Sequence, residues 1–249
     1  MKLLLLCLAG FISAFVDSIA GGGGLISVPA FMLYGLPPHI VLGTNKFAAT
    51  TASLTSSIKY ITSGTTNKKL LKFLGPMSFL GAVIGVNIVL KINQKYLYGM
   101  VLVLILAVGV YTLFSKTIGT EDKFEGLNRK NIIMGMLFAF LIGGYDGFFG
   151  PGTGSFLIFG LINIYGFNFL NAGGNARFLN FLSNIASLLV FAYKGMVDYK
   201  TAVPVAIFMI IGARLGTKAA LYNGSKFIKP IFVTMSLLVA TRMLYNLFQ

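Results

Sequence analysis

The sequence is poor in the residues that build catalytic and metal centres. It has one cysteine, one histidine, no tryptophan and six acidic residues among 249. A single cysteine excludes an internal disulfide and any site with several cysteine ligands. One histidine leaves no paired His ligands and no Ser/His/Asp set. We therefore expect no enzyme, no metal site and no cofactor.

Charge is scarce as well, which points to a membrane. Charged residues make up 10% of the chain and hydrophobic residues 56%, with a mean hydropathy of +0.84, whereas soluble domains carry about 25% charge. The composition predicts an all-α polytopic membrane protein surrounded by the lipid bilayer. The net charge is +14, but the basic residues lie in short loops and not on one clustered face, which argues against nucleic-acid binding.

Apolar runs follow one another along nearly the whole chain. Most are close to the roughly 20 residues that cross a bilayer, but two of them are shorter. The runs lie at about 3–20, 24–36, 40–63, 70–90, 96–115, 131–149, 153–166, 169–193, 201–221 and 228–248. The first resembles a signal peptide. We expect it to be retained, because cleavage after Ala20 would remove Asp17, whose counterpart Asp146 lies deep in the chain.

The order of these runs indicates an internal repeat. A shift of about 130 residues places Asp17 on Asp146 and Lys46 on Arg177. We expect one transporter-like domain over 1–249, with homologous halves at 1–115 and 131–249 and a polar linker at 116–130. Each half would hold a glycine-broken helix pair followed by three transmembrane helices, for 8–10 crossings in all. Inverted halves follow if the short runs cross, and parallel halves if they are half-helices.

The basic loops predict the orientation. Cytoplasmic loops carry an excess of Lys and Arg, so we expect the 64–69 loop and the 116–130 loop on the cytoplasmic side of a bacterial inner membrane. Eight cations in or beside them support this: Lys59, Lys68, Lys69, Lys72, Lys116, Lys123, Arg129 and Lys130.

Two of the six acids lie inside apolar runs. Asp17 and Asp146 are each followed, four residues on, by a glycine-rich break. Charge at membrane depth is costly, and a bent backbone there needs polar partners or a water-filled cavity. Three roles remain open for each acid: a cap for the broken helix, a proton carrier, or the partner of a buried cation.

Two cations have matched positions in the halves. Lys46 follows Thr44 and Asn45, and Arg177 follows Asn175. A cation beside free backbone N–H groups suits an oxyanion, and an arginine can hold two oxygens at once. The alternative is that both side chains extend to the membrane interface.

Polar side chains and glycines complete the candidate site. Asn180 and Asn184 share the helix face of Arg177, and their amides could orient a solute or bond a neighbouring helix. Hydroxyls after Lys46 form a similar strip at Thr50, Ser53 and Ser57. In the breaks we expect backbone N–H groups to face a solute at Gly22, Gly23, Gly152, Thr153 and Gly154.

The sequence resembles the TauE/SafE family of membrane proteins, also called the sulfite exporter or toluene sulfonate uptake permease family. The matching stretches are residues 16–29 (VDSIAGGGGLISVP), 43–46 (GTNK), 145–155 (YDGFFGPGTGS), 179–181 (LNF) and 183–184 (SN). The resemblance implies a bacterial inner-membrane permease with two related halves that moves small sulfur-containing or organic anions. The family commonly has a lysine where this chain has Arg177.

Together these observations predict a secondary transporter for a small anion, such as sulfite, a sulfonate, another organosulfur anion or a carboxylate. The solute would lie between the halves near mid-membrane, and Lys46 and Arg177 would attract its charge. Asp17 or Asp146 would organise the site or carry a coupling proton, and alternating access would come from rocking of the halves. The alternatives are a passive anion channel and a membrane scaffold without transport activity.

Overall fold

The computed structural model describes residues 1–93 and 121–247. Within these residues the fold is entirely helical, which confirms the predicted class. The predicted run at 96–115 and the first part of the linker, 116–120, lie outside them. The helices are α1 (Lys2–Ala20), α2 (Gly24–Tyr34), α3 (Pro38–Thr62), α4 (Lys68–Val89), α6 (Arg129–Phe148), α7 (Thr153–Tyr165), α8 (Phe169–Tyr193) and α9 (Tyr199–Leu247).

Five of the described helices are long and apolar enough to cross a membrane: α1, α4, α6, α8 and residues 199–224 of α9. The short runs became α2 and α7, of 11 and 13 residues. At about 1.5 Å per residue they extend for no more than about 20 Å, less than the roughly 30 Å of a bilayer core. Each is thus a partial span next to a glycine break, as expected of a re-entrant piece.

Helix α3 has the length but not the apolar character of a span. Its 25 residues carry a series of threonines and serines, five of which are buried, and it packs against α8 and α9. A helix that neighbouring helices cover does not need an apolar surface all round. The predicted run at 40–63 therefore forms one helix that begins earlier, at the helix-starting Pro38.

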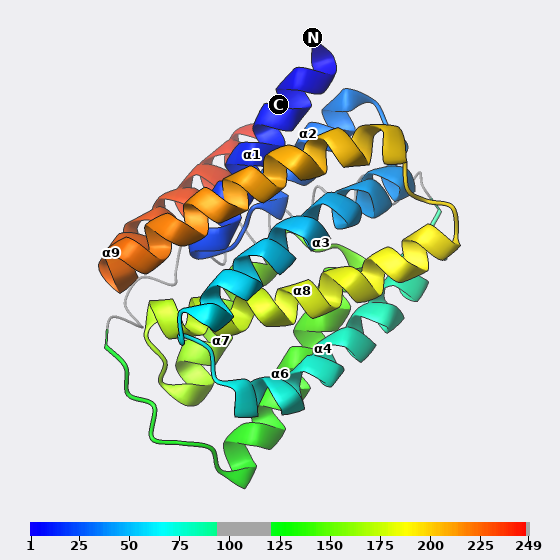
Figure 1. Ribbon diagram of the computed structural model, residues 1–249. Coiled ribbons are helices and arrows are strands. Elements are labelled where there is room, and N and C mark those ends of the chain that lie inside the picture. Colours follow the sequence, from blue (N-terminus) through cyan, green and yellow to red (C-terminus); the bar gives the residue numbers. More distant parts are fainter. Residues whose placement is uncertain (94–120, 248–249) are drawn as a thin grey trace.

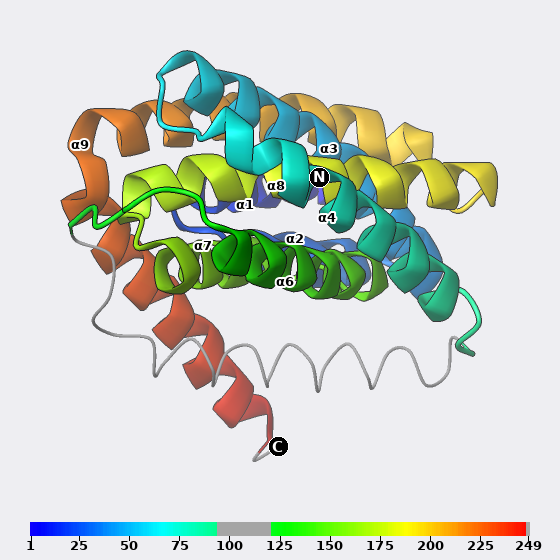
Figure 2. The same ribbon diagram turned by 90° about the horizontal axis from the view of Figure 1, so that it is seen from below.

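The helices form two layers. Figure 1 shows α9, α3, α8 and α4 side by side in front, with α1, α2, α7 and α6 behind them, and Figure 2 shows the same two layers from below. Helix α9 bends at Gly224, which has a positive φ of 67° that glycine adopts without strain. The predicted runs at 201–221 and 228–248 thus correspond to two helical segments of α9 that meet at this non-helical glycine, and residue 248 lies outside the described part of the chain.

The two predicted halves run in opposite directions. Helix α3 is antiparallel to α8, since Gly43 packs on Met196 at one end and Tyr60 on Gly173 towards the other. Helix α1 is parallel to α9 and α4 is parallel to α6. Helices α1, α3 and α9 therefore point one way and α4, α6 and α8 the other. This favours the inverted arrangement although the two short helices are partial spans. The expected link between half-helices and parallel halves therefore does not hold here, and the repeat itself stays a prediction.

The apolar core is divided between the two ends of the bundle. One buried cluster contains Phe31, Val41 and Phe191, and the other contains Leu74 and Leu157. The first gathers the beginnings of α1, α3 and α9, and the second the ends of α1 and α3 together with the beginnings of α4 and α8. The middle of the bundle is left to the polar residues of the two breaks.

The two basic loops lie together at one end. The Lys123 N–H of the linker donates to Gly166 O at 2.7 Å. A cavity of about 390 Å³ is lined both by residues of the loop before α4, including Thr65, and by residues of the linker, including Phe124. The structure thus places both loops on the same side of the bundle.

Candidate functional site

The first glycine break is held by the acid that precedes it. Gly21 ends α1 with a φ of +78°, and the chain turns back to begin α2. Asp17 Oδ1 accepts a hydrogen bond from the Gly23 N–H at 2.9 Å, and Ser13 Oγ donates to Gly23 O at 2.7 Å. Both backbone hydrogen-bonding groups of Gly23 are thereby satisfied by α1, so Asp17 does serve as a cap.

The second break has a similar construction at the end of α6. Gly150 and Gly152 have positive φ values of 98° and 84°. The hydroxyl of Thr153 donates to Gly150 O at 2.7 Å, and that of Tyr145 to Pro151 O at 2.6 Å. These bonds fix the turn that leads into α7.

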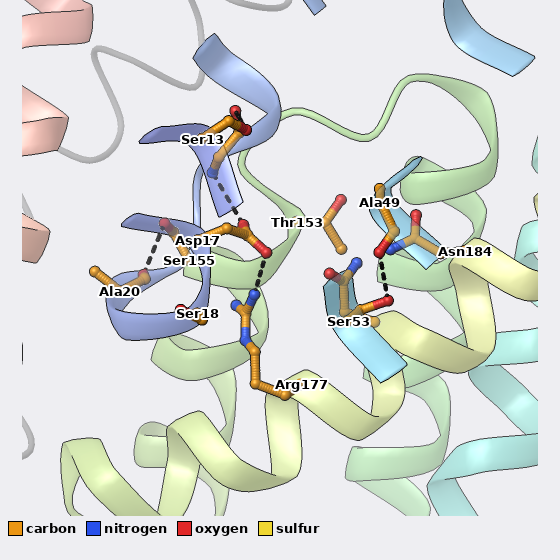
Figure 3. A network of polar contacts seen from close by, with 12 residues as sticks. Ser13, Asp17, Ser18, Ala20, Ala49, Ser53, Thr153, Ser155, Arg177 and Asn184 are labelled. Carbon is orange, nitrogen blue, oxygen red and sulfur yellow. Dashed lines mark hydrogen bonds and ion pairs between the residues drawn. The ribbon is translucent and has the colours of Figure 1, made fainter. Parts of the chain in front are cut away.

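The two breaks touch each other in the middle of the bundle. A Cβ built on Gly154 would lie 2.9 Å from Gly21 Cα, which is too close for two non-bonded carbon atoms. The hydroxyl of Ser155 donates to Ala20 O at 3.3 Å. Figure 3 shows Ser155 against the end of α1. Glycine at position 154 is thus required by the close approach of the two backbones.

Arg177 pairs with Asp17. Its Nη1 donates to Asp17 Oδ2, and its side chain is 1% exposed. Figure 3 shows the guanidinium reaching from α8 to the acid on α1. Asp17 thus binds the break through one oxygen and the arginine through the other, so it acts both as a cap and as the partner of a buried cation.

Lys46 pairs with the other acid. Its Nζ lies 2.9 Å from Asp146 Oδ2 and donates to Asn184 Oδ1 at 2.9 Å. The side chains of Lys46 and Asp146 are 4% and 2% exposed. An ammonium has three N–H donors, and these two contacts occupy two of them. Neither Lys46 nor Arg177 extends to the surface, so the interfacial alternative does not describe this structure.

The ion pairs join opposite parts of the chain. The cation of α3 meets the acid of α6, and the cation of α8 meets the acid of α1. Each pair is neutral as a whole, which lowers the cost of placing charge at membrane depth. The four residues therefore tie the two predicted halves together at the level of the breaks.

A cavity of about 40 Å³ opens beside the Lys46 pair. Most of the predicted site residues line it, from both halves: Asp17, Asn45, Lys46, Asp146, Gly152, Thr153, Gly154, Asn180 and Asn184. In the described residues, Asn45 Oδ1 is buried without a hydrogen-bond partner. Figure 3 shows Thr153 between Asp17 and Asn184. The walls thus combine one cation, two acids, amides and glycine backbone.

Other predicted site residues lie elsewhere. Thr44 Oγ1 accepts from the Asp198 N–H at 3.0 Å, and Asn175 Oδ1 accepts from the Asn67 N–H at 2.9 Å. Both tie neighbouring segments together. Gly22, Gly23 and Arg177 adjoin the breaks but are not among the residues that line the cavity.

Most hydroxyls of the polar strips on α3 and α8 bond their own helix. Thr50 Oγ1 donates to Lys46 O at 2.6 Å, Ser53 Oγ to Ala49 O at 2.7 Å and Ser187 Oγ to Ser183 O at 2.7 Å. These are bonds to the preceding turn of the same helix. In the described residues none of these three hydroxyls bonds a neighbouring helix, whereas the buried Ser57 Oγ has no hydrogen-bond partner.

Several cavity residues escaped the sequence analysis. Ser13, Ser27 and Gly150 line the cavity. Ser13 lies four residues before Asp17, on the same face of α1, and that spacing is the signal that could have identified it. Among the described residues no group of three or more His, Cys, Asp or Glu gathers around a common point, so the site as described has no metal-ligand set.

Comparison with known proteins identifies a family for the chain. The family model described as "Sulfite exporter TauE/SafE" matches residues 6–243. No solved structure matches the chain significantly.

Curated relatives cover almost the whole chain. A probable membrane transporter protein of Haemophilus influenzae is 36% identical over 244 residues, which is 98% of this chain and 95% of the relative. The probable membrane transporter protein ORF9 of Sinorhizobium sp is 36% identical over 97% of this chain and 92% of its own length. The probable membrane transporter protein YfcA of Escherichia coli K12 is 34% identical over 94% and 87%.

Proposed function

We propose that this chain, which belongs to the TauE/SafE sulfite exporter family, is a secondary transporter for a small anion. The relatives are named as membrane transporters, and the described helices include five candidate spans, as in a multi-pass protein of the bacterial inner membrane. The proposed substrate is sulfite, a sulfonate, another organosulfur anion or a carboxylate.

One observation carries the proposal: the Lys46 ammonium lies in the wall of a cavity that is also lined by amide side chains and by the backbone of the glycine breaks. With two of its three donors bound to Asp146 and Asn184, one donor is left for a solute. Asn45 and Asn180 line the same space and can donate to anion oxygens through their NH₂ groups. Ammonium and amide donors together suit an oxyanion.

The size of the cavity favours a small solute. Its volume of about 40 Å³ corresponds to roughly three water molecules at the 10–15 Å³ that one buried water needs. An oxyanion with about four heavy atoms is close to this size. A bulkier sulfonate needs the walls to move apart.

The position of the cavity suits alternating access. It lies where the two glycine breaks touch, between helices of opposite direction from the two predicted halves. Rocking of one half against the other about this contact would open the cavity to one end of the bundle and then to the other. Arg177 and Asp17 would hold the breaks together during this movement, so we assign them to the frame of the site and Lys46 to the solute.

Uptake by purified protein in proteoliposomes tests the proposal. We expect the wild type to accumulate radiolabelled sulfite or a sulfonate when an ion or solute gradient is applied. The variant Lys46→Gln should lose at least about 90% of this uptake, because the cation is removed. Arg214→Gln is the matched control, since Arg214 lies in an apolar run of α9 but is exposed.

The alternatives give different results in the same assay. A passive channel would equilibrate the anion across the vesicle membrane without accumulating it against a gradient. A scaffold would show no uptake that depends on Lys46. Either result would overturn the proposed function.

A further inference from the structure

The buried pair of Lys46 and Asp146 also limits how an anion can bind. Without a solute, the ammonium already has a counter-ion at 2.9 Å, and both side chains are at most 4% exposed. A monoanion that entered the cavity would place two negative charges against one positive charge, away from water. This is unfavourable at membrane depth, so the anion must replace the carboxylate as the partner of Lys46.

The replacement is balanced if Asp146 takes up a proton. Before binding, the ammonium and the carboxylate sum to zero charge. After binding, the ammonium, a neutral carboxylic acid and a monoanion sum to zero as well. The proton comes from water on the side where the anion enters and returns to water on the side where it leaves. The neutral Asp146 carboxylic acid can then donate a hydrogen bond through its O–H to an oxygen of the anion.

The groups around Asp146 leave it as the best candidate for this proton. From α3 it faces Lys46, and from α8 the neutral Asn184, which shares the ammonium. Helix α4 packs on α6 through Gly81, Ala82 and Gly85, which carry no charge. The hydroxyl of the adjacent Tyr145 donates its hydrogen bond to Pro151 O at 2.6 Å.

The other acid of the cavity is held differently. Asp17 uses one oxygen for the Gly23 N–H and the other for Arg177, so protonation would break the cap of the first glycine break. Asp146 is not tied to a backbone N–H by any described hydrogen bond. Protonation of Asp146 would release Lys46 without undoing a turn.

We propose that Asp146 binds a coupling proton, so that one proton moves with each monoanion in the same direction. This inference rests on the proposed function, since it specifies how the same cavity exchanges its charges. It makes transport electroneutral and driven by the pH gradient.

Calorimetric binding to the purified protein tests the inference. The probe is methanesulfonate, an anion whose own charge does not change between about pH 5 and pH 8, so that any proton taken up belongs to the protein. Titrations in buffers of different ionisation enthalpy give the number of protons bound with each anion. We expect about one proton per anion towards alkaline pH, with a Kd that rises about tenfold per pH unit.

Three variants locate the proton. Asp146→Asn should bind the probe with no proton uptake and with a Kd that is independent of pH. Asp198→Asn is the control outside the cavity and should behave as the wild type. Asp17→Asn should still take up a proton, and loss of uptake in this variant instead of Asp146→Asn would overturn the assignment.

The outcomes separate this inference from the proposed function. If the wild type binds the anion without proton uptake, the coupling is wrong and the anion site stands. If the wild type binds neither methanesulfonate nor sulfite, the proposed function fails and the inference with it. The wild-type measurement does not depend on whether any variant folds.

Discussion

The guanidinium of Arg177 occupies the space in which a side chain of residue 154 would lie, and Gly154 leaves that space free. A Cβ on Gly154 would meet Arg177 Nη2 and would be 2.9 Å from Gly21 Cα. Neither neighbour can easily give way, because one is buried in an ion pair with Asp17 and the other is backbone. The contact between the breaks and the placement of the arginine thus depend on one missing methyl group.

The variant Gly154→Ala should therefore be clearly destabilised. Overpacking of this kind costs about 1–3 kcal/mol, and we expect a lower midpoint of thermal unfolding in detergent together with reduced uptake. Gly173→Ala is the control, since its Cβ would have only Tyr60 Oη within 4 Å, at 3.9 Å. A control variant as unstable as Gly154→Ala would contradict the proposed crowding.

Variants of the Lys46–Asp146 ion pair allow the effects on stability and on transport to be measured separately. Lys46→Gln leaves a buried carboxylate without its cation, which costs about 3–5 kcal/mol. The double variant Lys46→Gln/Asp146→Asn removes both charges, so most of this stability should return, whereas uptake should not. Denaturant unfolding and proteoliposome uptake measured on the same preparations test both parts. Recovery of transport in the double variant would show that the charge of Lys46 is dispensable.

Much of the fold could be predicted because apolar runs and glycine-rich breaks are recognised from residues that are close together in the sequence. The breaks after Asp17 and Asp146 were placed correctly, since glycine-rich segments interrupt apolar runs there. The short helices were also recognised by their length. Such features depend on neighbouring residues in the sequence, which are visible without coordinates.

The partners of the charged residues could not be predicted in the same way. Asp17 and Arg177 are 160 residues apart, and nothing local shows that each acid pairs with the cation of the other half. Thr44 and Asn175 were placed at the site because each precedes a cation by two residues. Positions two apart on a helix do not share a face, and both residues bind other segments instead.

The glycines of two helix pairs provide a test of the predicted repeat. Gly81 of α4 packs on the carbonyl of Phe140 in α6, and Gly212 of α9 packs on that of Phe11 in α1. If the halves are homologous, these are equivalent contacts between parallel helices. Gly81→Ala and Gly212→Ala should then lower stability by similar amounts, about 1–3 kcal/mol each.

Gly144→Ala is the control for these two variants. Its Cβ would come no closer than 3.6 Å to Gly81 O, which is an ordinary contact, so we expect little change in the unfolding midpoint. A large effect at only one of the two equivalent glycines would indicate that the helix pairs are not equivalent.

The shared position of the two basic loops predicts the orientation of the bundle. Lys68 and Glu125 are exposed near the same end of the molecule, and Lys194 is exposed at the opposite end, after α8. Because positively charged loops stay in the cytoplasm, cysteines introduced at the first two positions should react with a membrane-impermeant maleimide only after the inner membrane is opened. Lys194→Cys should react in intact spheroplasts.

These cysteine variants are best made in a Cys7→Ala background, since the only natural cysteine is buried in α1. Labelling of Lys68→Cys and Glu125→Cys from opposite sides would contradict the structure, because the two loops line one cavity. Labelling of both positions from the periplasm would be consistent with the fold but would contradict the predicted orientation. The distribution of positive charge would then not set the topology of this protein, since the end with the basic loops would face outward.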